Sequence, residues 1–227
     1  MISIIIPTFN EEESIGELIS YLKADAPKDE IEIIISDGGS TDSTKEIAQR
    51  KGAVVIETPK QGRAAQMNFG AKHAIGDMLY FLHADTYPPK AFLDDIIGSL
   101  SNGDKAGCYR LSFDDDHPLL KFYCWFTRFD IDFFRFGDQS LFIKKSLFEK
   151  LKGFNEQFIV MEDQDIVRRI KKKASFTILP KQVVTSARKY RQVGILKLQL
   201  IFTIVLIRFY LGTPQKKLIE FYKRAIN

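Results

Sequence analysis

Polar segments follow three of the most apolar runs in the chain, and each lies where a β-strand is expected to end. They are Phe9-Asn10-Glu11 after SIIIP (3–7), Asp37-Gly38-Gly39 after IEIIIS (31–36) and His83-Ala84-Asp85 after MLYFLHA (78–84). Carboxylates at such positions can accept hydrogen bonds from a ribose or a base, or hold a divalent cation. Taken alone, each such segment is more often a turn or a helix cap than a binding site.

Asp85 poses this choice most sharply, in the stretch MLYFLHADTYPP. Pro88 and Pro89 end the strand in either case, so the carboxylate either closes a turn or is placed for a ligand. Asp37 has two similar interpretations, since it can close an Asx turn or accept a hydrogen bond from a ribose or base. The glycine-rich DGGSTDST (37–44) suits an anion at a helix start, although it lacks the dinucleotide fingerprint and the phosphate-binding loop.

Two charged segments further along the chain also carry possible chemistry. Arg63, in KQGRAAQ, is either a solvated arginine or a forked donor for a phosphate or base. In EDQDIVRRIKKK (162–173), Glu162 and Asp163 either favour the positive end of a helix or supply a general base. Asp165 and Arg169 are four residues apart and are expected to pair.

Strands and helices alternate through the first half of the chain. The expected strands are continuously apolar, which indicates a mostly parallel sheet covered by helices on both faces. Expected helices include 64–75 and 90–100. Ligands of such sheets bind beyond the carboxyl ends of the strands, so the three polar segments should converge on one rim. The second half differs, with an alternating strand at 105–113, many aromatics between 122 and 136, and two short strands around Pro180.

Composition indicates a globular protein, because 45% of the 227 residues are hydrophobic and 27% are charged. Cys108 and Cys124 form neither a disulfide framework nor a zinc motif, so we expect a reducing compartment and a cytoplasmic protein. The apolar run at the N-terminus is cut at Pro7 and lacks a basic leader. It is therefore expected to be a first strand and not a signal peptide or membrane anchor.

The net charge of +4 conceals an asymmetry, because residues 166–219 contain 13 Lys or Arg and no acid. Such a block indicates that the chain binds phosphates, on a nucleotide or at the inner face of a membrane. The alternative is a solvated basic face without a partner. The apolar stretch 193–212 includes Lys197 and Arg208, so a bilayer-crossing helix is not expected. We expect it to lie in a membrane interface, in a homodimer contact or in the core.

The order of the motifs resembles the inverting A-fold glycosyltransferases of the large family two. These motifs are PTFNEEESI, IIISDGGSTDST, GRAAQMNFGA, LHADT, GDQ and EDQD. The forms FLHADT, GDQSLF and TSARKY are similar to those of a bacterial, non-processive subgroup. The resemblance implies an α/β fold with a mostly parallel mixed sheet flanked by helices. It also implies a single domain at 1–190, with a nucleotide-sugar-binding half (1–104) and an acceptor-side half (105–190), followed by C-terminal helices at 191–227.

The resemblance also implies roles for individual residues. Pro7, Phe9 and Glu11 match the motif that lies against the nucleoside, and Asp37 matches a carboxylate that contacts the base or ribose. Arg63 lies in the segment that closes over the nucleotide. Asp85 matches the last acid of the Asp-x-Asp motif, which holds Mg²⁺ or Mn²⁺ against the diphosphate. His83, which departs from that motif, can help a metal, contact phosphate or merely pack. Asp163, with Glu162 beside it, matches the catalytic base.

Two departures from the family pattern refine the hypothesis. His83-Ala84-Asp85 stands where much of the family has two or three acids, which makes metal dependence less certain. The Gln-x-x-Arg-Trp motif of polymer-making relatives is absent, so a single transfer is expected from a nucleotide sugar, with UDP-sugar as the favoured donor. The acceptor is unknown and can be lipid-linked, and no nucleic-acid partner is expected. The alternatives are a binding protein without turnover, for a nucleotide sugar or lipid phosphate, or a nucleotidyltransferase of related fold.

Overall fold

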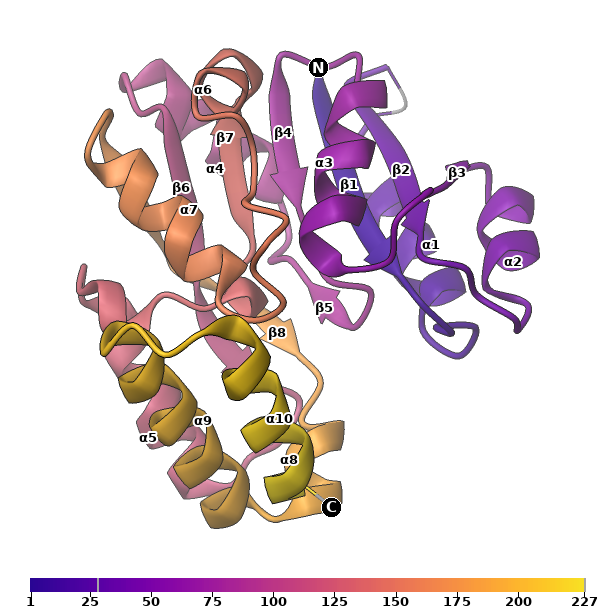
Figure 1. Cartoon of the computed structure of the whole chain (residues 1–227). Helices are drawn as coiled ribbons and strands as arrows, with labels where there is room; N and C mark the ends of the chain where they lie inside the picture. Colours follow the sequence, from indigo (N-terminus) through magenta and orange to yellow (C-terminus); the bar gives the residue numbers. More distant parts are fainter. Residues whose placement is uncertain (28, 227) are drawn as a thin grey trace.

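The computed structural model describes residues 1–27 and 29–226, and its centre is an eight-stranded mixed sheet (Figure 1). The strand order is β3-β2-β1-β4-β7-β6-β8-β5. The strands are β1 (Ile2–Thr8), β2 (Ile31–Asp37), β3 (Val54–Glu57), β4 (Met78–Phe81), β5 (Thr86–Tyr87), β6 (Ala106–Phe113), β7 (Leu141–Lys144) and β8 (Phe176–Thr185).

Helices connect and cover these strands. They are α1 (Ile15–Asp25), α2 (Thr44–Arg50), α3 (Arg63–His73), α4 (Phe92–Ser101), α5 (Pro118–Trp125), α6 (Lys145–Lys150), α7 (Glu162–Lys171), α8 (Arg188–Val193), α9 (Ile195–Tyr210) and α10 (Gln215–Ile226). Three short 3₁₀ turns, η1 (Phe126–Arg128), η2 (Asp132–Phe134) and η3 (Gly137–Gln139), lie between α5 and β7.

The sheet changes character halfway across. Strands β3, β2, β1 and β4 run parallel, whereas β7 is antiparallel to both β4 and β6. Beyond them β6 and β8 are parallel, and the short β5 is antiparallel to β8. The predicted α/β class with a mostly parallel mixed sheet is therefore confirmed. The parallel half is the half whose sequence alternates strands with helices.

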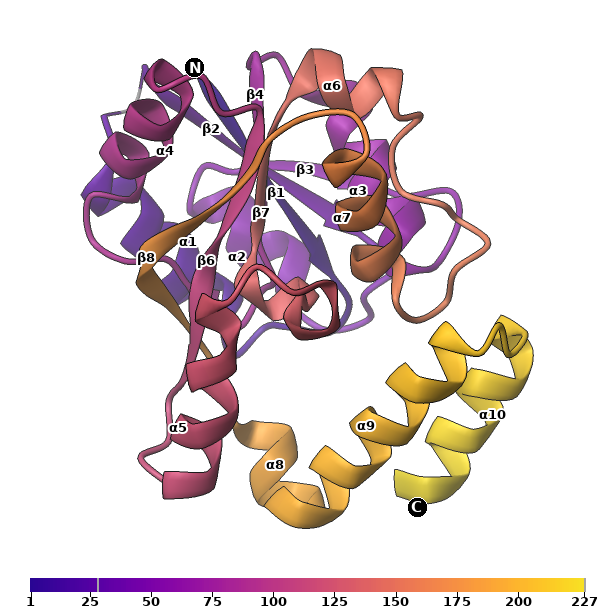
Figure 2. The same cartoon turned by 90° about the vertical axis from the view of Figure 1, so that its left-hand side faces the viewer.

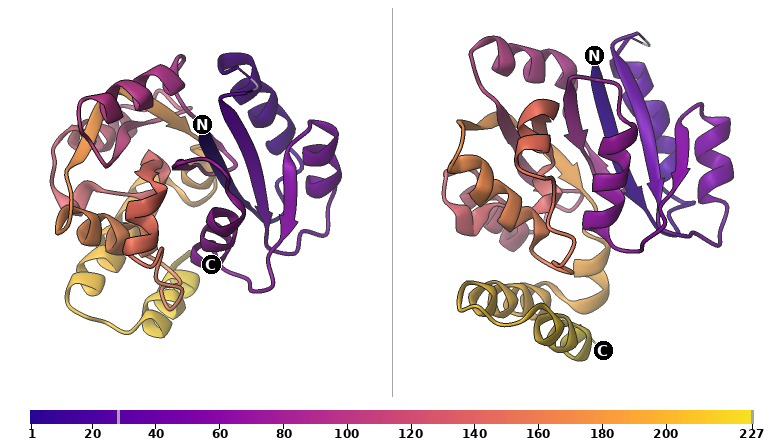
Figure 3. Two further views of the ribbon diagram at one scale, coloured as in Figure 1. Left: turned by 90° about the horizontal axis from the view of Figure 1, so that it is seen from above. Right: turned by 45° about the horizontal axis from the view of Figure 1, so that its top comes forward.

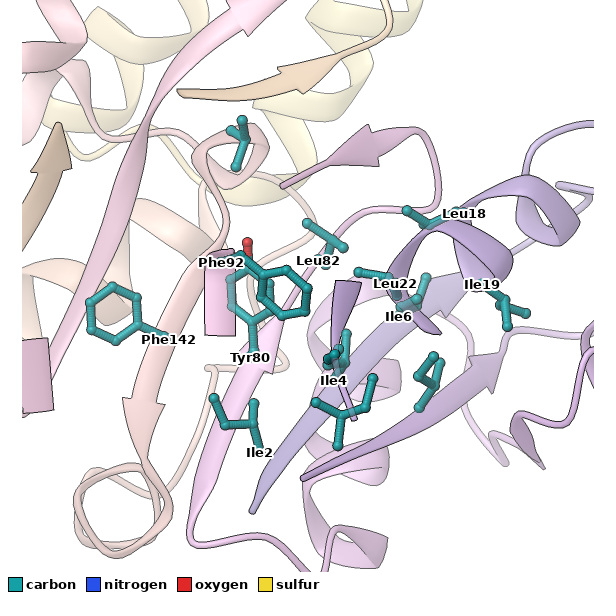
Figure 4. Close-up of a cluster of buried hydrophobic side chains, with 14 of the residues drawn as sticks. Ile2, Ile4, Ile6, Leu18, Ile19, Leu22, Tyr80, Leu82, Phe92 and Phe142 are labelled. Carbon is teal, nitrogen blue, oxygen red and sulfur yellow. The ribbon is translucent and has the colours of Figure 1, made fainter. Parts of the chain in front are cut away.

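The continuous apolar strands are explained by helices on both faces of the sheet. Ile4 and Ile6 of β1 pack with α1 and α4 on one face, as Figure 4 shows for part of this cluster. Ile5, between them, packs with α3 and α7 on the opposite face. Because successive strand residues point to opposite faces, every position of β1 is buried.

Two predicted elements differ in the structure. The segment around Pro180 is one strand, β8, and not two short ones. Its pairing with β6 jumps from Leu179 to Gln182, so the chain absorbs the proline, which has no N–H to donate, in a bulge. The apolar segment at 193–212 begins with a break, because Gly194 has a φ of 93° between α8 and α9.

The C-terminal helices lie at the end of the sheet where β1 and β4 finish. Figure 2 shows α8, α9 and α10 beyond this edge, and both views of Figure 3 place α9 and α10 side by side. Among the described residues, no helix is both long and apolar enough to cross a membrane. One face of α9 is exposed, with Leu196 67% and Leu200 60% accessible, and Leu211, which directly follows the helix, is 78% accessible.

Candidate active site

The rim of the parallel half brings together the polar segments that follow β1, β2 and β4. Thr8 at the end of β1 pairs with Asp37 at the end of β2, and Ile5 pairs with Phe81 of β4. The backbone N–H of Leu82 then donates to the Ile5 carbonyl at 3.1 Å. Three loops that are far apart in the sequence consequently leave the sheet side by side.

Asp37 is fully buried behind this rim and holds its own loop. Its carboxylate accepts hydrogen bonds from the backbone N–H groups of Gly39 at 2.9 Å and Ser40 at 2.8 Å, and from the Thr8 hydroxyl at 3.1 Å. Of the residues that the structure describes, those lining the adjacent cavity do not include Asp37. The Asx-turn interpretation of this residue is thus present in the structure, while contact with a ribose or base stays a prediction.

A cavity of about 430 Å³ lies at the rim, and we call it the polar cavity. Six of the predicted site residues line it: Pro7, Phe9, Glu11, Arg63, His83 and Asp85. Phe9 is 55% exposed and lies at the edge of the cavity, where its ring is an apolar surface. The other lining residues are Thr8, Gln66, Ala84, Asp138, Ser186, Arg188, Lys189 and Gln192.

Asp85 closes no turn with its side chain. The turn after β4 is formed by backbone groups, since Thr86 donates its N–H to the His83 carbonyl at 3.2 Å. The Asp85 carboxylate instead lines the polar cavity and, in the described part of the chain, has no ion-pair partner within 4 Å. Partial burial and then the nearby Asp138 charge raise the pKa of Asp85. The Asp85 carboxylate therefore faces the cavity, and its role in binding a ligand stays a prediction.

Basic residues reach the polar cavity because β5 pairs with β8. Thr86 lies opposite Thr185, and the Ser186 N–H donates to the Asp85 carbonyl at 3.2 Å. Helix α8 begins directly afterwards, which places Arg188 and Lys189 on the cavity wall. The neighbouring Arg191 is turned away and pairs with Asp114 at 3.1 Å.

His83 is paired across the cavity with Asp138 of η3, with 3.0 Å between Nδ1 and the carboxylate. Burial acts to lower the pKa of His83, but the hydrogen bond and charge of Asp138 outweigh it and raise the pKa. In the opposite sense, desolvation of Asp138 is outweighed by His83, and the pKa of this carboxyl is lowered. Both shifts favour the charged pair.

The first turn of α7 places Glu162 beneath the cavity wall. Its carboxylate is 1% exposed, and Nε of Arg63 lies 2.7 Å from it. Among the described residues no donor is aligned for a hydrogen bond to either carboxylate oxygen. Burial and the adjacent Asp163 charge raise the pKa of Glu162 to about 7, against the opposing effect of Arg63.

Asp163, the next residue, projects into a second cavity of about 460 Å³. Its carboxylate lies against Gly137 of η3 so closely that a side chain at that position would collide with it. The glycine of the GDQ motif therefore leaves room for this acid. Five residues line both cavities: Arg63, Asp85, Asp138, Ser186 and Lys189.

We call the second space the aromatic cavity, because most of its wall consists of rings and aliphatic side chains. The wall runs from β6 and α5 through the 3₁₀ turns to α9. Its aromatic members are Phe113, Tyr123, Phe126, Phe133, Phe134, Phe136, Tyr190, Phe202 and Tyr222. Asp163 and the five shared residues form its polar end.

Asp138 was not among the predicted site residues, although the GDQ motif that contains it was noted in the sequence. Its position depends on the irregular chain between α5 and β7, which no periodicity describes. Gln66 was likewise missed. Its amide donates to the carbonyls of Thr8 at 2.7 Å and Ser36 at 2.9 Å, so it fixes the end of β1 from α3.

The side chains of the polar cavity could hold a divalent cation only if a bound substrate and water supplied further oxygen atoms to it. No group of three or more His, Cys, Asp or Glu side chains that could hold a metal occurs in residues 1–27 and 29–226. However, Mg²⁺ and Mn²⁺ sites in phosphate-binding proteins often use one or two carboxylates plus substrate oxygens and water. The unpaired Asp85 carboxylate, with its raised pKa, is suited to that role.

The sheet and the position of the polar cavity define an A-type glycosyltransferase fold, which solved structures share. TarS of Staphylococcus aureus in complex with UDP-GlcNAc superposes with a TM-score of 0.69 at 21% identity, covering 82% of this chain and 58% of that one. A mannosyltransferase from Pyrobaculum calidifontis, in complex with GDP-Man and Mn²⁺, superposes with a TM-score of 0.69 at 19% identity. The superposition covers 99% of this chain and 73% of that one.

The sequence matches the model of glycosyl transferase family 2 over residues 3–149, and the chain belongs to this family. The glycosyltransferase AglE of Haloferax volcanii is 33% identical over 107 residues, which are 44% of this chain and 35% of AglE. A Methanococcus voltae enzyme described as a dolichyl N-acetylglucosaminyl phosphate diacetamidodideoxyglucuronosyltransferase is 38% identical over 104 residues, 42% of this chain and 32% of the enzyme. The matched region thus spans about a third of each curated relative.

Proposed function

We propose that the chain is an inverting, non-processive glycosyltransferase that moves one sugar from a nucleotide donor, a UDP-sugar, to an acceptor hydroxyl. The observation that carries this is the junction of the two cavities. The polar cavity presents Arg63, Arg188 and Lys189 for a diphosphate, and Asp163 stands where it opens into the aromatic cavity. Family membership supports the proposal.

The reaction follows from these positions. Phe9 packs against the base at the cavity edge, and the basic side chains bind the diphosphate. The acceptor oxygen attacks the anomeric carbon from the side of Asp163, which takes the hydroxyl proton. The bond between that carbon and the β-phosphate oxygen breaks, so the nucleoside diphosphate leaves and the configuration inverts. Mg²⁺ or Mn²⁺ held by Asp85 would supply neutralising charge at the diphosphate.

The test of this proposal uses the purified chain with UDP-, GDP- and dTDP-sugars and, in a parallel assay, with nucleoside triphosphates. We expect a UDP-sugar with Mn²⁺ to raise the melting temperature, because a ligand stabilises the state that binds it, and to release UDP. Affinity without release would favour a binding protein. Attack on a nucleoside triphosphate with release of pyrophosphate would favour a nucleotidyltransferase. Failure of all three sugar classes to bind would contradict the donor assignment.

We also propose that the exposed apolar face of α9 contacts the inner face of a membrane. Leu196, Leu200 and Leu211 are exposed there, and α10 adds basic residues in its last turn. Apolar side chains beside basic ones favour an anionic bilayer surface. We expect the chain to co-sediment with anionic liposomes at low salt and less so at high salt. A chain that stays monodisperse and ignores such liposomes would contradict this, whereas a concentration-dependent dimer would indicate a homodimer contact instead.

A further inference from the structure

The aromatic cavity has a wall that the nucleotide chemistry does not require. Residues 122–136 contribute five of its nine aromatic side chains, and Arg135 organises this segment from within. Arg135 is 1% exposed, and its guanidinium donates to the carbonyls of Thr127 and Phe129. The Gln164 amide of α7 in turn donates to the Arg135 carbonyl. The rings are therefore fixed by buried hydrogen bonds next to Asp163, and are not a loose surface patch.

Helix α9 closes the opposite side. Leu198, Val205 and Leu206 are buried, and all three line the cavity. Leu200, on the same helix, is 60% exposed and is not among the described lining residues. A single helix thus separates the aromatic cavity from the exposed apolar face.

Several polar atoms in the wall on the side of α7, α8 and α9 are already engaged with one another. The Tyr190 hydroxyl donates to Gln199 Oε1 at 2.9 Å, and the Thr203 hydroxyl donates to the Gln199 carbonyl at 2.8 Å. Gln164 Oε1 accepts from Tyr210 at 3.1 Å. A ligand with many hydroxyls would lose its water there and gain few partners, whereas a hydrocarbon would be favourably buried.

We propose that the aromatic cavity is the acceptor site and that the acceptor is an alcohol with a hydrocarbon body, bound with its hydroxyl toward Asp163. This rests on the proposed glycosyl transfer and specifies its acceptor class. The hydroxyl meets the polar end, where Arg63, Asp85 and Lys189 belong to both cavities. The body lies between α5 and α9, so a free sugar or a polar polymer is a poor acceptor.

The test compares Thr203→Trp with Leu200→Trp. The first places an indole in the cavity and the second places it on the exposed face of the same helix. Binding of the isoprenoid alcohol geraniol is measured by titration, with glucose and glycerol as polar comparison alcohols and UDP-sugar binding measured on every variant. We expect saturable binding of geraniol alone, at least a tenfold loss of its affinity in Thr203→Trp, and wild-type behaviour in Leu200→Trp. UDP-sugar affinity should stay unchanged in both.

A second measurement needs no variant. A diazirine-bearing analogue of geraniol should label the wild-type chain within residues 122–136 and 198–206, as mapped by mass spectrometry. Labelling elsewhere, stronger binding of the polar alcohols, or undiminished geraniol affinity in Thr203→Trp would overturn the inference. UDP-sugar turnover without geraniol binding refutes this inference alone. Geraniol binding without any UDP-sugar binding instead refutes the proposed function on which it rests.

Discussion

The polar and the aromatic cavity share five wall residues but have opposite chemistry. The first lies at the ends of parallel strands and is lined by charges, including Asp85, Arg188 and Lys189. The second is enclosed by irregular 3₁₀ segments and C-terminal helices and is lined mainly by aromatic and aliphatic side chains. Regular α/β elements thus build the charged cavity, while the irregular half of the chain builds the apolar one.

Asp163 lies where the two cavities meet, so its replacement should reduce sugar transfer without changing binding in either cavity. We expect Asp163→Asn to lower turnover by on the order of 10³-fold, because the amide cannot accept the acceptor proton. UDP-sugar and geraniol affinities, measured by titration, should stay near wild type. Asp165→Asn is the matched control, since Asp165 pairs with Arg169 at 2.7 Å on the same helix. Transfer by Asp163→Asn at the wild-type rate would assign the base elsewhere.

Asp85→Ala should affect the polar cavity selectively. Loss of the carboxylate is expected to weaken Mn²⁺-dependent UDP-sugar binding by about 10- to 100-fold, in the range found for weakened metal sites. Geraniol affinity should change little, because the hydrocarbon wall is intact. Asp94→Ala, an exposed acid on α4, serves as the control. An unchanged dependence on Mn²⁺ in calorimetric titrations would show that the cation is held by other groups or is not needed.

The sequence could predict the polar cavity far better than the aromatic one. Continuous apolar runs place the ends of β1 and β4, and a parallel sheet puts those ends together, so Glu11 and Asp85 were expected at one rim. The sequence could not decide whether Asp37 faces a ligand, because the same carboxylate also closes its own turn. The structure shows that turn, with Gly39 and Ser40 as donors.

The aromatic cavity depends on contacts that have no sequence period. Phe126, Phe134 and Tyr190 line one cavity because Arg135 holds the 3₁₀ segment in place and β8 leads directly into α8. Asp138 was missed for the same reason, since its pairing with His83 joins η3 to the end of β4. Residues at the rim of a parallel sheet can be assigned from local signals. Residues that meet across an irregular segment require the tertiary structure.

Glu162 lies beneath the wall that the two cavities share, and its expected effect is on stability and not on turnover or binding. Its folded-state pKa of about 7 lies above the ordinary value of 4.5, chiefly through burial. Its contribution to stability is therefore fully present below about pH 4.5 and is lost as the pH rises through about 7. The shift corresponds to on the order of 3 kcal/mol, because one pKa unit corresponds to about 1.4 kcal/mol.

Glu162→Gln should remove this pH-dependent contribution to stability, because glutamine carries no titratable proton. Glutamine also has nearly the same shape, so the packing should be kept. Urea unfolding between about pH 5 and 8 should give a flatter stability profile for the variant than for the wild type, with the variant relatively more stable at the alkaline end. Glu149→Gln, an exposed acid on α6, should retain the wild-type profile. A wild-type profile in Glu162→Gln would mean that Arg63, 2.7 Å away, keeps the carboxylate ionised throughout. In that case the shared wall would carry a permanent ion pair and not a group that titrates near neutral pH.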